Sequence, residues 1–503
     1  MADPDHKASD APRAVWLAGL AIVGVSLFAG LVGAMFGRGP WYDEFYTIYV
    51  TRPEFSFFEA LRHHWLPDNH PPLFYGLSWM TKGLGGDVEP RRLVNLLILA
   101  IAVTELCVLG KRHARWREVL ALFFLALASS QIAILTGAEL RSNFLAYISA
   151  AIAVAGLALL AGPEAPRPSW RNGAGLAVIL AIAFNVHFAA TVLTGTVGAA
   201  FGLRLMIARD WSKLGWLGAV GLAAALPLIV TLAIQLGNIE ANTRSFWIEG
   251  GLDNARWAFE REILSILAAN LPLTVAGLAG LVLLARSSWA DRKLDPKLDL
   301  VLTLGAGCAL GIAALTALHL WRPIVINRYL VALSAPAFFI LATGTSALLG
   351  RLGRTSKAVV IALVAIAALV AIAANGRTAR DLASWDGTAR AIGEQVRACK
   401  GARVHVDMSW NKSTLALPPG DARKVVPMAY RDMAKRHGFA LEPQGSRVMA
   451  EDCPTIFWTE HFASDQPDSQ ELAASLKARG YAIGDAQLRR IGAGWLFLST
   501  PRK

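Results

Sequence analysis

The chain has 503 residues, of which 54% are hydrophobic and only 17% are charged. A water-soluble enzyme usually carries about a quarter charged residues, so the composition excludes an ordinary soluble globular protein. The formal net charge is +12, but the basic residues are clustered between apolar segments. We therefore interpret the charge as an orientation signal in a membrane and expect no nucleic-acid partner.

Long apolar runs follow one another along the first three quarters of the chain. A helix needs about 20 apolar residues to cross a bilayer, and most of the runs approach that length. They lie at approximately 14–36, 93–110, 119–135, 142–161, 174–186, 188–207, 215–236, 264–285, 298–319, 329–350 and 358–376. We predict an α-helical polytopic membrane protein with about eleven spans. No clear small-x-small cleavage signal follows the first run, so it is interpreted as a retained anchor.

Basic clusters occupy alternate gaps between these runs. They are 111–117, 167–171, 209–213, 286–297 and 351–357, together with Lys7 and Arg13 before the first run. The positive-inside rule places these gaps and the N-terminus in the cytoplasm. The opposite gaps then face outward: 37–90, 136–141, 237–263, 320–328 and the chain after about 377. The least certain turn is Asn185-Val186-His187, where His187 is expected as a turn residue and not as a ligand.

The outward loop 37–90 contains two apolar segments that do not span. Residues 55–65 have apolar positions spaced for a helix with one hydrophobic face, which would lie in the membrane interface. Residues 72–84 are apolar but too short to cross. A third juxtamembrane helix is expected in the gap 237–263, which carries several arginines and tryptophans.

After residue 376 the hydropathy falls to that of a soluble protein. We predict helices at 378–399 and 470–479 and strands at 404–408, 455–458 and 495–498. The chain then divides into a transmembrane catalytic domain, 1–376, and a small outward α/β domain, 377–503, which recruits a partner or positions an acceptor. Cys399 and Cys453 both lie in this outward region, where a disulfide is chemically permitted, and their pairing is left open.

The first candidate for chemistry is the run Trp41-Tyr42-Asp43-Glu44, directly after the first span. Neighbouring side chains diverge along a helix or strand, so the two carboxylates are expected to have different roles. One carboxylate suffices as the general base of a single displacement. Helix capping or solvation at the interface is the alternative interpretation for both.

Four cationic positions fall at the same outward ends: His70 before Pro71-Pro72, Arg92, Arg141 and Arg328. Arginines near span ends can simply extend to the aromatic belt of the interface. The alternative is a cluster that binds phosphate, since a guanidinium matches phosphate oxygens in a bidentate way. Arg328 is the strongest candidate because it lies nearest the beginning of its span.

Taken together, these motifs resemble the GT-C superfamily of membrane glycosyltransferases, in particular the bacterial protein O-mannosyltransferase and aminoarabinose transferase families. The resemblance rests on Trp41-Tyr42-Asp43-Glu44, His70-Pro71-Pro72-Leu73-Phe74-Tyr75, Arg92-Leu93-Val94-Asn95 and Arg328-Tyr329-Leu330, and covers about residues 10–350. Two positions depart from it. The aminoarabinose transferases tend to have lysine where His70 stands, and an aromatic residue three positions after the glutamate is replaced by Thr47.

The resemblance implies a transferase that takes a sugar from a polyprenyl-phosphate donor at the outer face of the membrane. Asp43 would be the catalytic base and Glu44 would shape the site, while His70, Arg92, Arg141 and Arg328 would bind the donor phosphate. The expected substrate-binding aromatic residues are Trp41, Tyr42, Tyr46, Tyr75 and Tyr329. No cofactor is expected to be required, although Asp43 and Glu44 could hold a divalent metal ion.

The expected location is the bacterial inner membrane, with the C-terminal region in the periplasm. The acceptor is left open among lipopolysaccharide, another envelope glycan, a lipid and a protein. A transporter or flippase of lipid-linked sugars is the competing class, since eleven spans suit it equally. A transporter should carry ionisable residues deep within its spans, whereas here they cluster at the outward ends, which favours the enzyme.

Overall fold

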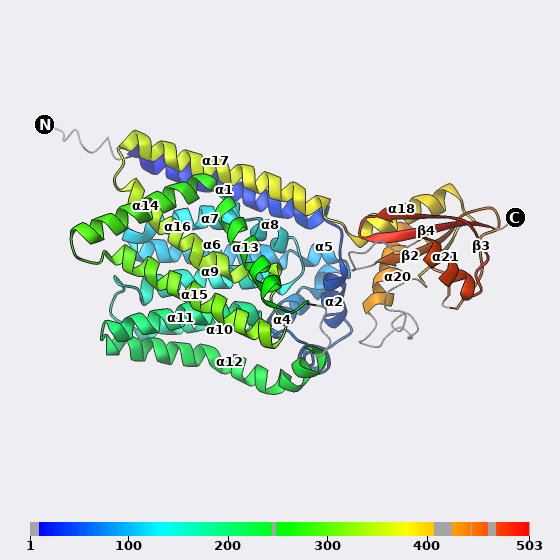
Figure 1. The fold of residues 1–503 in the computed structure, drawn as a ribbon, viewed down its shortest axis with the longest axis horizontal. Helices are drawn as coiled ribbons and strands as arrows, with labels where there is room; N and C mark the ends of the chain where they lie inside the picture. Colours follow the sequence, from blue (N-terminus) through cyan, green and yellow to red (C-terminus); the bar gives the residue numbers. More distant parts are fainter. Residues whose placement is uncertain (1–9, 244–247, 407–424, 444, 461–468, 502–503) are drawn as a thin grey trace. The chain divides into compact units, whose positions relative to one another are not determined.

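The computed structural model describes residues 10–243, 248–406, 425–443, 445–460 and 469–501. The chain folds as two compact units (Figure 1). The first consists of Met1–Met35, Phe55–Thr81 and Arg92–Ala379, and the second of Phe36–Glu54, Lys82–Arg91 and Arg380–Lys503. The second unit therefore combines two pieces of the 37–90 loop with the C-terminal region. The predicted domain boundary at residue 376 stays a prediction.

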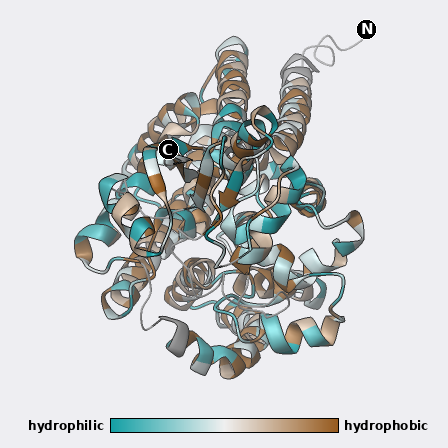
Figure 2. Cartoon of the chain, turned by 90° about the vertical axis from the view of Figure 1, so that its right-hand side faces the viewer, coloured by the Kyte–Doolittle hydropathy of each residue, from teal (hydrophilic) through white to brown (hydrophobic). Residues whose placement is uncertain are grey.

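The first unit is built from the long apolar helices. Their bounds are α1 Asp10–Gly37, α6 Val94–Arg112, α7 Arg117–Ser129, α8 Gln131–Gly137, α9 Ser142–Leu160, α10 Trp170–Phe184, α11 Phe188–Ile207, α12 Trp211–Thr243, α14 Leu271–Ala290, α15 Pro296–Trp321, α16 Ser334–Leu349 and α17 Arg354–Asp381. Hydrophobic residues dominate these helices, and hydrophilic residues concentrate in the shorter helices and loops (Figure 2).

The predicted multi-pass membrane protein is confirmed. Within the described residues, nine helices are long and apolar enough to cross a membrane, and the pair α7–α8, bent by 61°, would make a tenth. The shorter α10, with 15 residues, corresponds to the remaining predicted run. One predicted span, 264–285, begins too early. Asn270 caps α14 by accepting from the amide of Leu273 at 3.2 Å, and it separates α14 from α13, Leu252–Ala268.

The centre of the bundle is formed by α9, almost all of whose residues are buried, and α16, most of whose residues are buried. Small residues allow α16 to cross α14 at close range. A Cβ atom added to Gly280 would lie 1.7 Å from the carbonyl oxygen of Gly344, so any side chain there would force the helices apart. Such crossings are typical of membrane helices, which gain stability from close packing and not from burial away from water.

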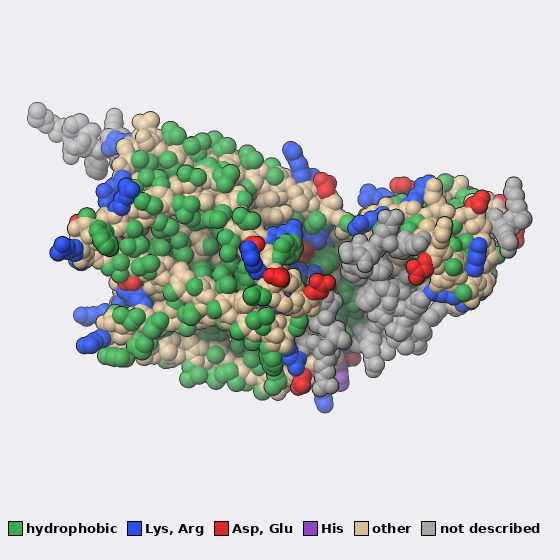
Figure 3. Space-filling model, in the orientation of Figure 1, with side chains coloured by type: hydrophobic (Ala, Val, Ile, Leu, Met, Phe, Trp, Pro, Cys, Tyr) green, Lys and Arg blue, Asp and Glu red, His purple; other side chains and the backbone are tan. Residues whose placement is uncertain are grey.

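The Lys- and Arg-rich connections of the bundle meet at one of its ends (Figure 3). Lys357 forms an ion pair with Glu118 at 2.6 Å, and Ser346 bonds both Glu118 and Lys297. In the same way, Lys213 donates to the carbonyl oxygen of Ala165, in the connection between α9 and α10, at 3.1 Å. These contacts join connections that the charge pattern assigned to the same side of the membrane.

Short helices are present in the loops 37–90 and 237–263, where juxtamembrane helices were expected. α3, Phe57–Ala60, continues into a π-helical turn, η1, Leu61–Trp65, and α4 follows at Leu73–Met80. Phe57 packs edge-on against Trp65 and Trp79, and the Trp79 indole donates to the carbonyl oxygen of Phe55 at 3.0 Å. The third helix is α13, which buries one face and exposes apolar residues on the other.

The second unit contains a four-stranded sheet with helices packed on it. Its elements are α2 Tyr42–Val50, α5 Val88–Arg91, α18 Trp385–Ala398, β1 Arg403–His405, α20 Val425–His437, β2 Thr455–Glu460, α21 Ser469–Ala478, β3 Ile483–Ile491 and β4 Gly494–Pro501. The strand order is β1-β2-β4-β3, with β1 parallel to β2 and the other pairs antiparallel. The expected small α/β fold is confirmed.

Two details of this unit differ from the sequence prediction. The single helix expected at 378–399 is divided, because α17 continues to Asp381 and Ser384 caps a new helix, α18. α20 and the edge strand β3 were not predicted, and β3 is polar and mostly exposed, so it lacks a hydrophobic alternation. The predicted strand end at 407–408 lies outside the described residues.

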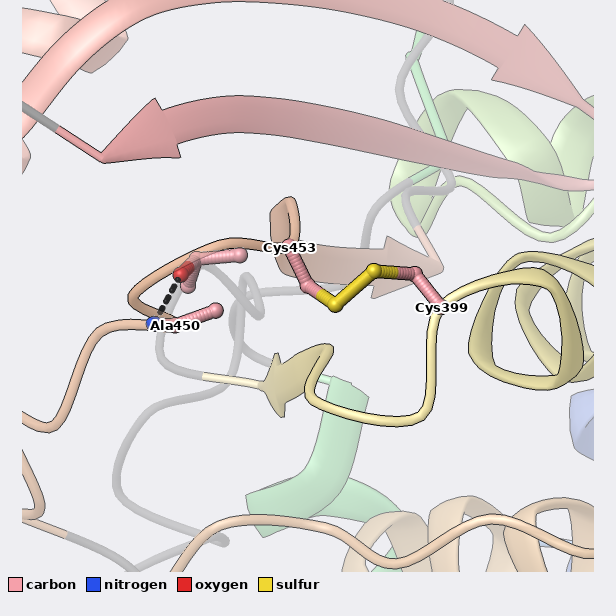
Figure 4. Close-up of a disulfide and its surroundings, with 4 residues drawn as sticks. Cys399, Ala450 and Cys453 are labelled. Atoms are coloured by element: carbon pink, nitrogen blue, oxygen red, sulfur yellow. Dashed lines mark hydrogen bonds between the residues drawn. A yellow bond between two sulfur atoms is a disulfide. The ribbon is translucent and has the colours of Figure 1, made fainter.

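Cys399 and Cys453 form a disulfide (Figure 4). It ties the end of α18 to the turn before β2, where the amide of Ala450 also bonds the Thr455 hydroxyl at 2.9 Å. The two cysteines are 54 residues apart in the chain, and closing a loop of this length stabilises the folded state by about 4 kcal/mol. Cys107 and Cys308 are free thiols.

Candidate functional site

The acidic motif forms the first turn of α2. The carbonyl oxygen of Trp41 accepts from the amides of Glu44 at 3.0 Å and Phe45 at 3.2 Å, and carboxylates in this first turn are favoured by the helix dipole. The Glu44 side chain is 0% exposed, whereas Asp43 is partly exposed. The aromatic residues Trp41, Tyr42 and Tyr46 are partly exposed as well. Asp43 is therefore the carboxylate of the pair that can meet a substrate.

α2 is held in place by the C-terminal region of its own unit. The Phe45 ring packs against Trp385 of α18 at a centroid distance of 5.4 Å, and the Trp385 amide donates to the carbonyl oxygen of Pro40 at 3.1 Å. On α5, Arg91 donates to the hydroxyl of Thr51 at 2.6 Å, directly after α2. Helices α18 and α5 of the second unit thus support the helix that carries Asp43, a role that the sequence of the C-terminal region did not indicate.

A cluster of cationic and aromatic side chains forms in the first unit around His187. Its ring lies 5.9 Å from the ring of His70 and 4.6 Å from that of Tyr329, centroid to centroid. Arg141 stands at the extended residue before α9 and is 9% exposed. Arg328 belongs to the 3-10 turn Asn327–Tyr329, and its guanidinium lies 5.5 Å from the Tyr329 ring. Three predicted phosphate ligands are therefore neighbours.

His187 is the residue of this cluster that sequence reasoning missed. It precedes α11, as a turn residue would, but its side chain is 6% exposed. Burial, together with the nearby charges of His70, Arg141 and Arg328, lowers the pKa of His187 to about 3. The imidazole is therefore neutral at physiological pH. The only signal in the sequence was a histidine at a short polar break between two apolar runs.

Asp68 is a second residue that sequence reasoning did not single out. Its carboxylate lies 3.6 Å from Nδ1 of His70, accepts from the Tyr75 hydroxyl, and accepts from the Asn69 amide at 2.7 Å. Burial alone would raise its pKa, but these partners outweigh burial and hold the pKa below its usual value. Asp68 is therefore ionised beside His70.

An apolar groove of about 410 Å³ adjoins the cluster. Apolar side chains from the juxtamembrane helices and α12 line it, including Phe57, Trp65, Leu73, Leu77, Met80 and Pro227. Pro72 and Asn185 also line it, each two residues from a histidine of the cluster. Gln235 of α12 donates to the carbonyl oxygens of Trp65 and His70 at 3.1 and 3.0 Å, and so fixes the histidine beside the groove.

Arg92 and Tyr75 are both buried in the first unit. Arg92 is fully buried, and its guanidinium donates to the carbonyl oxygen of Met35 near the end of α1. Tyr75 is 3% exposed and bonds Asp68. The contacts of His187 thus bring together His70, Arg141, Arg328 and Tyr329. The predicted roles of Arg92 in binding phosphate and of Tyr75 in binding substrate stay predictions.

Glu262 of α13 supports the turn that carries Arg328. It is 2% exposed, and its Oε2 accepts from the Asn327 side chain at 3.0 Å. Burial raises the pKa of Glu262 to about 8, although the bond from Asn327 opposes the shift. The carboxyl is therefore protonated at pH 7 in the folded protein.

We expect Glu262→Gln to remove a pH-dependent loss of stability. An unfolded glutamate ionises near pH 4.5, so the folded state binds the extra proton between that pH and about 8, and stability falls as pH rises through this window. Glutamine stays neutral and can still accept from Asn327. At pH 8 the free energy of unfolding of the variant should exceed that of wild type by on the order of a few kcal/mol, and at pH 5 the two should differ little. Thermal unfolding in detergent at both pH values measures this, and parallel curves for the two proteins would contradict it.

Among the described residues, no group of three or more His, Cys, Asp or Glu side chains is arranged to hold a metal ion. The possible use of a divalent ion by Asp43 and Glu44 stays untested.

No family model and no curated protein matches the sequence. The structure is similar to two crystal structures of ArnT from Cupriavidus metallidurans, a GT-C aminoarabinose transferase. For the apo state the TM-score is 0.56, and for the form bound to undecaprenyl phosphate it is 0.55. Each alignment has 13% sequence identity and covers 97% of this chain and 99% of that chain. The GT-C fold expected from the motifs is thereby confirmed.

Proposed function

We propose that this protein is a membrane glycosyltransferase that moves a sugar from a polyprenyl-phosphate donor to an envelope acceptor. The observation that carries the proposal is the cationic cluster around His187 next to an apolar groove. A polyprenyl phosphate has the same two parts, an anionic head and a long apolar tail. The fold supports the proposal, because ArnT, which has a similar fold, has been crystallised with undecaprenyl phosphate.

In this proposal the donor phosphate lies against Arg141, Arg328 and His70, and the lipid tail follows the groove. Fixed cations stabilise the charge that develops on the departing phosphate, because they need no reorganisation when the bond breaks. Asp43 accepts the proton of the attacking hydroxyl as it meets the anomeric carbon, with inversion. If the acceptor is itself a phosphate, no base is needed and Asp43 orients it instead. A nucleotide sugar is not expected as donor.

The proposed location is the bacterial inner membrane, with the N-terminus in the cytoplasm and the second unit in the periplasm. The clustered basic connections support this orientation through the positive-inside rule. The Cys399–Cys453 disulfide supports it independently, because disulfides persist in the periplasm and are rare in the cytoplasm.

Mass spectrometry of envelope lipids and glycans from a deletion strain tests the proposal. We expect the strain to lack one sugar modification and to accumulate the lipid-linked donor on the outer leaflet. Accumulation on the cytoplasmic leaflet alone would instead identify a flippase. Purified protein should also bind undecaprenyl phosphate in detergent, and failure to bind would contradict the proposed donor class.

A further inference from the structure

We infer that His319 is a positioning residue: by holding the backbone that follows α15, it fixes the turn that carries Arg328 and Tyr329 beside His187. The inference rests on the proposed function, in which Arg328 contacts the donor phosphate. It assigns a role to a histidine at the end of a span that neither the sequence motifs nor the proposed reaction uses.

The short segment between α15 and the turn has an extended backbone. α15 ends at Trp321 and the turn begins at Asn327. The segment between them, 322–326, has extended residues at both of its ends. An extended segment that pairs with no other strand cannot satisfy its own amides. Because Val325 is only 1% exposed, its amide needs a partner elsewhere in the protein.

His319, on the last turn of α15, supplies the acceptor. Its Nδ1 atom accepts from the amides of Ile324 at 3.1 Å and Val325 at 3.0 Å, and its side chain is buried. Nδ1 accepts only when it carries no proton, so the two bonds fix the neutral tautomer with the proton on Nε2. Without this acceptor the buried amides would lose their partner, which is costly. The ring therefore ties the segment back onto the helix that it leaves.

α13 and the residues before it hold the same segment at two further points. A Cβ atom added to Gly250 would lie 3.1 Å from the Pro323 side chain, so the backbone at Gly250 packs closely on the proline. Further along the chain, Glu262 of α13 accepts from the Asn327 side chain at 3.0 Å. The bonds to His319 fall between these two contacts. The connection is thus fixed from the proline to the turn.

The fixed segment presents the turn to the cluster around His187. The Tyr329 ring lies 4.6 Å from the ring of His187, and the guanidinium of Arg328 lies 5.5 Å from the Tyr329 ring. A guanidinium that is held in place before the ligand arrives loses less conformational freedom on binding, and this raises the affinity. His319 therefore acts on the donor through Arg328.

The test is a double-mutant cycle on the affinity of the purified full-length protein for undecaprenyl phosphate in detergent. His319→Phe keeps an aromatic ring but removes the acceptor, and it should weaken binding by about tenfold, the cost of ordering a long side chain on binding. His319→Asn should restore most of the affinity, because its amide oxygen can take the place of Nδ1. In an Arg328→Gln background, His319→Phe should have no further effect, since the two residues act as a unit.

Two comparisons separate positioning from a general loss of stability. His405→Phe alters another buried histidine that contacts a backbone carbonyl, and its ring already stacks on Phe457, so the affinity should stay that of wild type. Hydrogen–deuterium exchange of residues 322–330 should rise in His319→Phe and not in His319→Asn. If His319→Phe does not fold, His319→Gln replaces it, because the longer side chain moves the acceptor away from the two amides.

Full affinity in a folded His319→Phe protein, or an equal loss of affinity with and without Arg328, would overturn the inference. Unchanged hydrogen–deuterium exchange of residues 322–330 in His319→Phe would overturn it as well, and this measurement requires no ligand. If the wild-type protein does not bind undecaprenyl phosphate, the proposed donor class fails, and the exchange experiment still decides whether His319 fixes the turn.

Discussion

Asp43→Asn is expected to reduce sugar transfer by about 10²- to 10⁴-fold, the usual contribution of a general base. Asparagine has the shape of aspartate but cannot take the acceptor proton. The fold should survive, because Asp43 is partly exposed and its backbone keeps the first turn of α2. Loss of its charge from the helix N-terminus costs about 0.3–1 kcal/mol.

Complementation of the deletion strain, read out by mass spectrometry of envelope glycans, measures this effect. Asp381→Asn is the matched control, since it removes an exposed carboxylate from the same unit by the same chemical change. It should restore the modification fully at equal protein level. Full restoration by Asp43→Asn would show that Asp43 is not the base, and the acceptor would then be one that needs no deprotonation.

Arg328→Gln should have the second largest effect, a loss of about 30- to 100-fold in affinity for undecaprenyl phosphate. A hydrogen bond to a charged group contributes about 1.5–3 kcal/mol, and each 1.4 kcal/mol is a factor of ten. Glutamine retains one donor but neither the charge nor the bidentate geometry of guanidinium. Arg328→Lys should recover part of the affinity, because the charge returns without the fork.

Arg256→Gln serves as the control for Arg328→Gln. Arg256 lies on α13, and its side chain is 71% exposed and paired with Glu260 at 2.6 Å, so its loss should leave binding unchanged. The double variant Arg141→Gln, Arg328→Gln should bind no better than the weaker single variant. Unchanged affinity in a folded Arg328→Gln protein would mean that the arginine only anchors its turn beside Tyr329.

The membrane architecture was predictable because it depends on local composition. Eleven apolar runs correspond to nine long helices, one bent pair and the short α10 within the described residues. A bilayer requires each spanning segment to be apolar over its whole length, so hydropathy alone finds it. The break at Asn270 was missed. Its side chain caps α14 locally, but its bonds to Ser129 and to the carbonyl oxygen of Val364 come from helices far away in the sequence.

The soluble region was predictable only in part. β2 and β4 are apolar and were predicted, whereas β3 is an edge strand whose exposed residues carry no periodic signal. The disulfide could be named only as permitted, because pairing requires the two Cα atoms to lie within about 7 Å. In the structure the Cα atoms of Cys399 and Cys453 are 5.8 Å apart.

The sequence by itself determined the membrane class, and it singled out the acidic motif and the candidate cations, since each is read from residue type and position relative to an apolar run. Only the tertiary structure decided which cations are neighbours. It placed Arg141, Arg328 and His70 around His187. It also brought Asp68 beside His70, and it directed the guanidinium of Arg92 to the carbonyl oxygen of Met35. His70 and Arg328 each lie more than a hundred residues from His187 in the chain, and helix packing, which no local pattern encodes, brings them together.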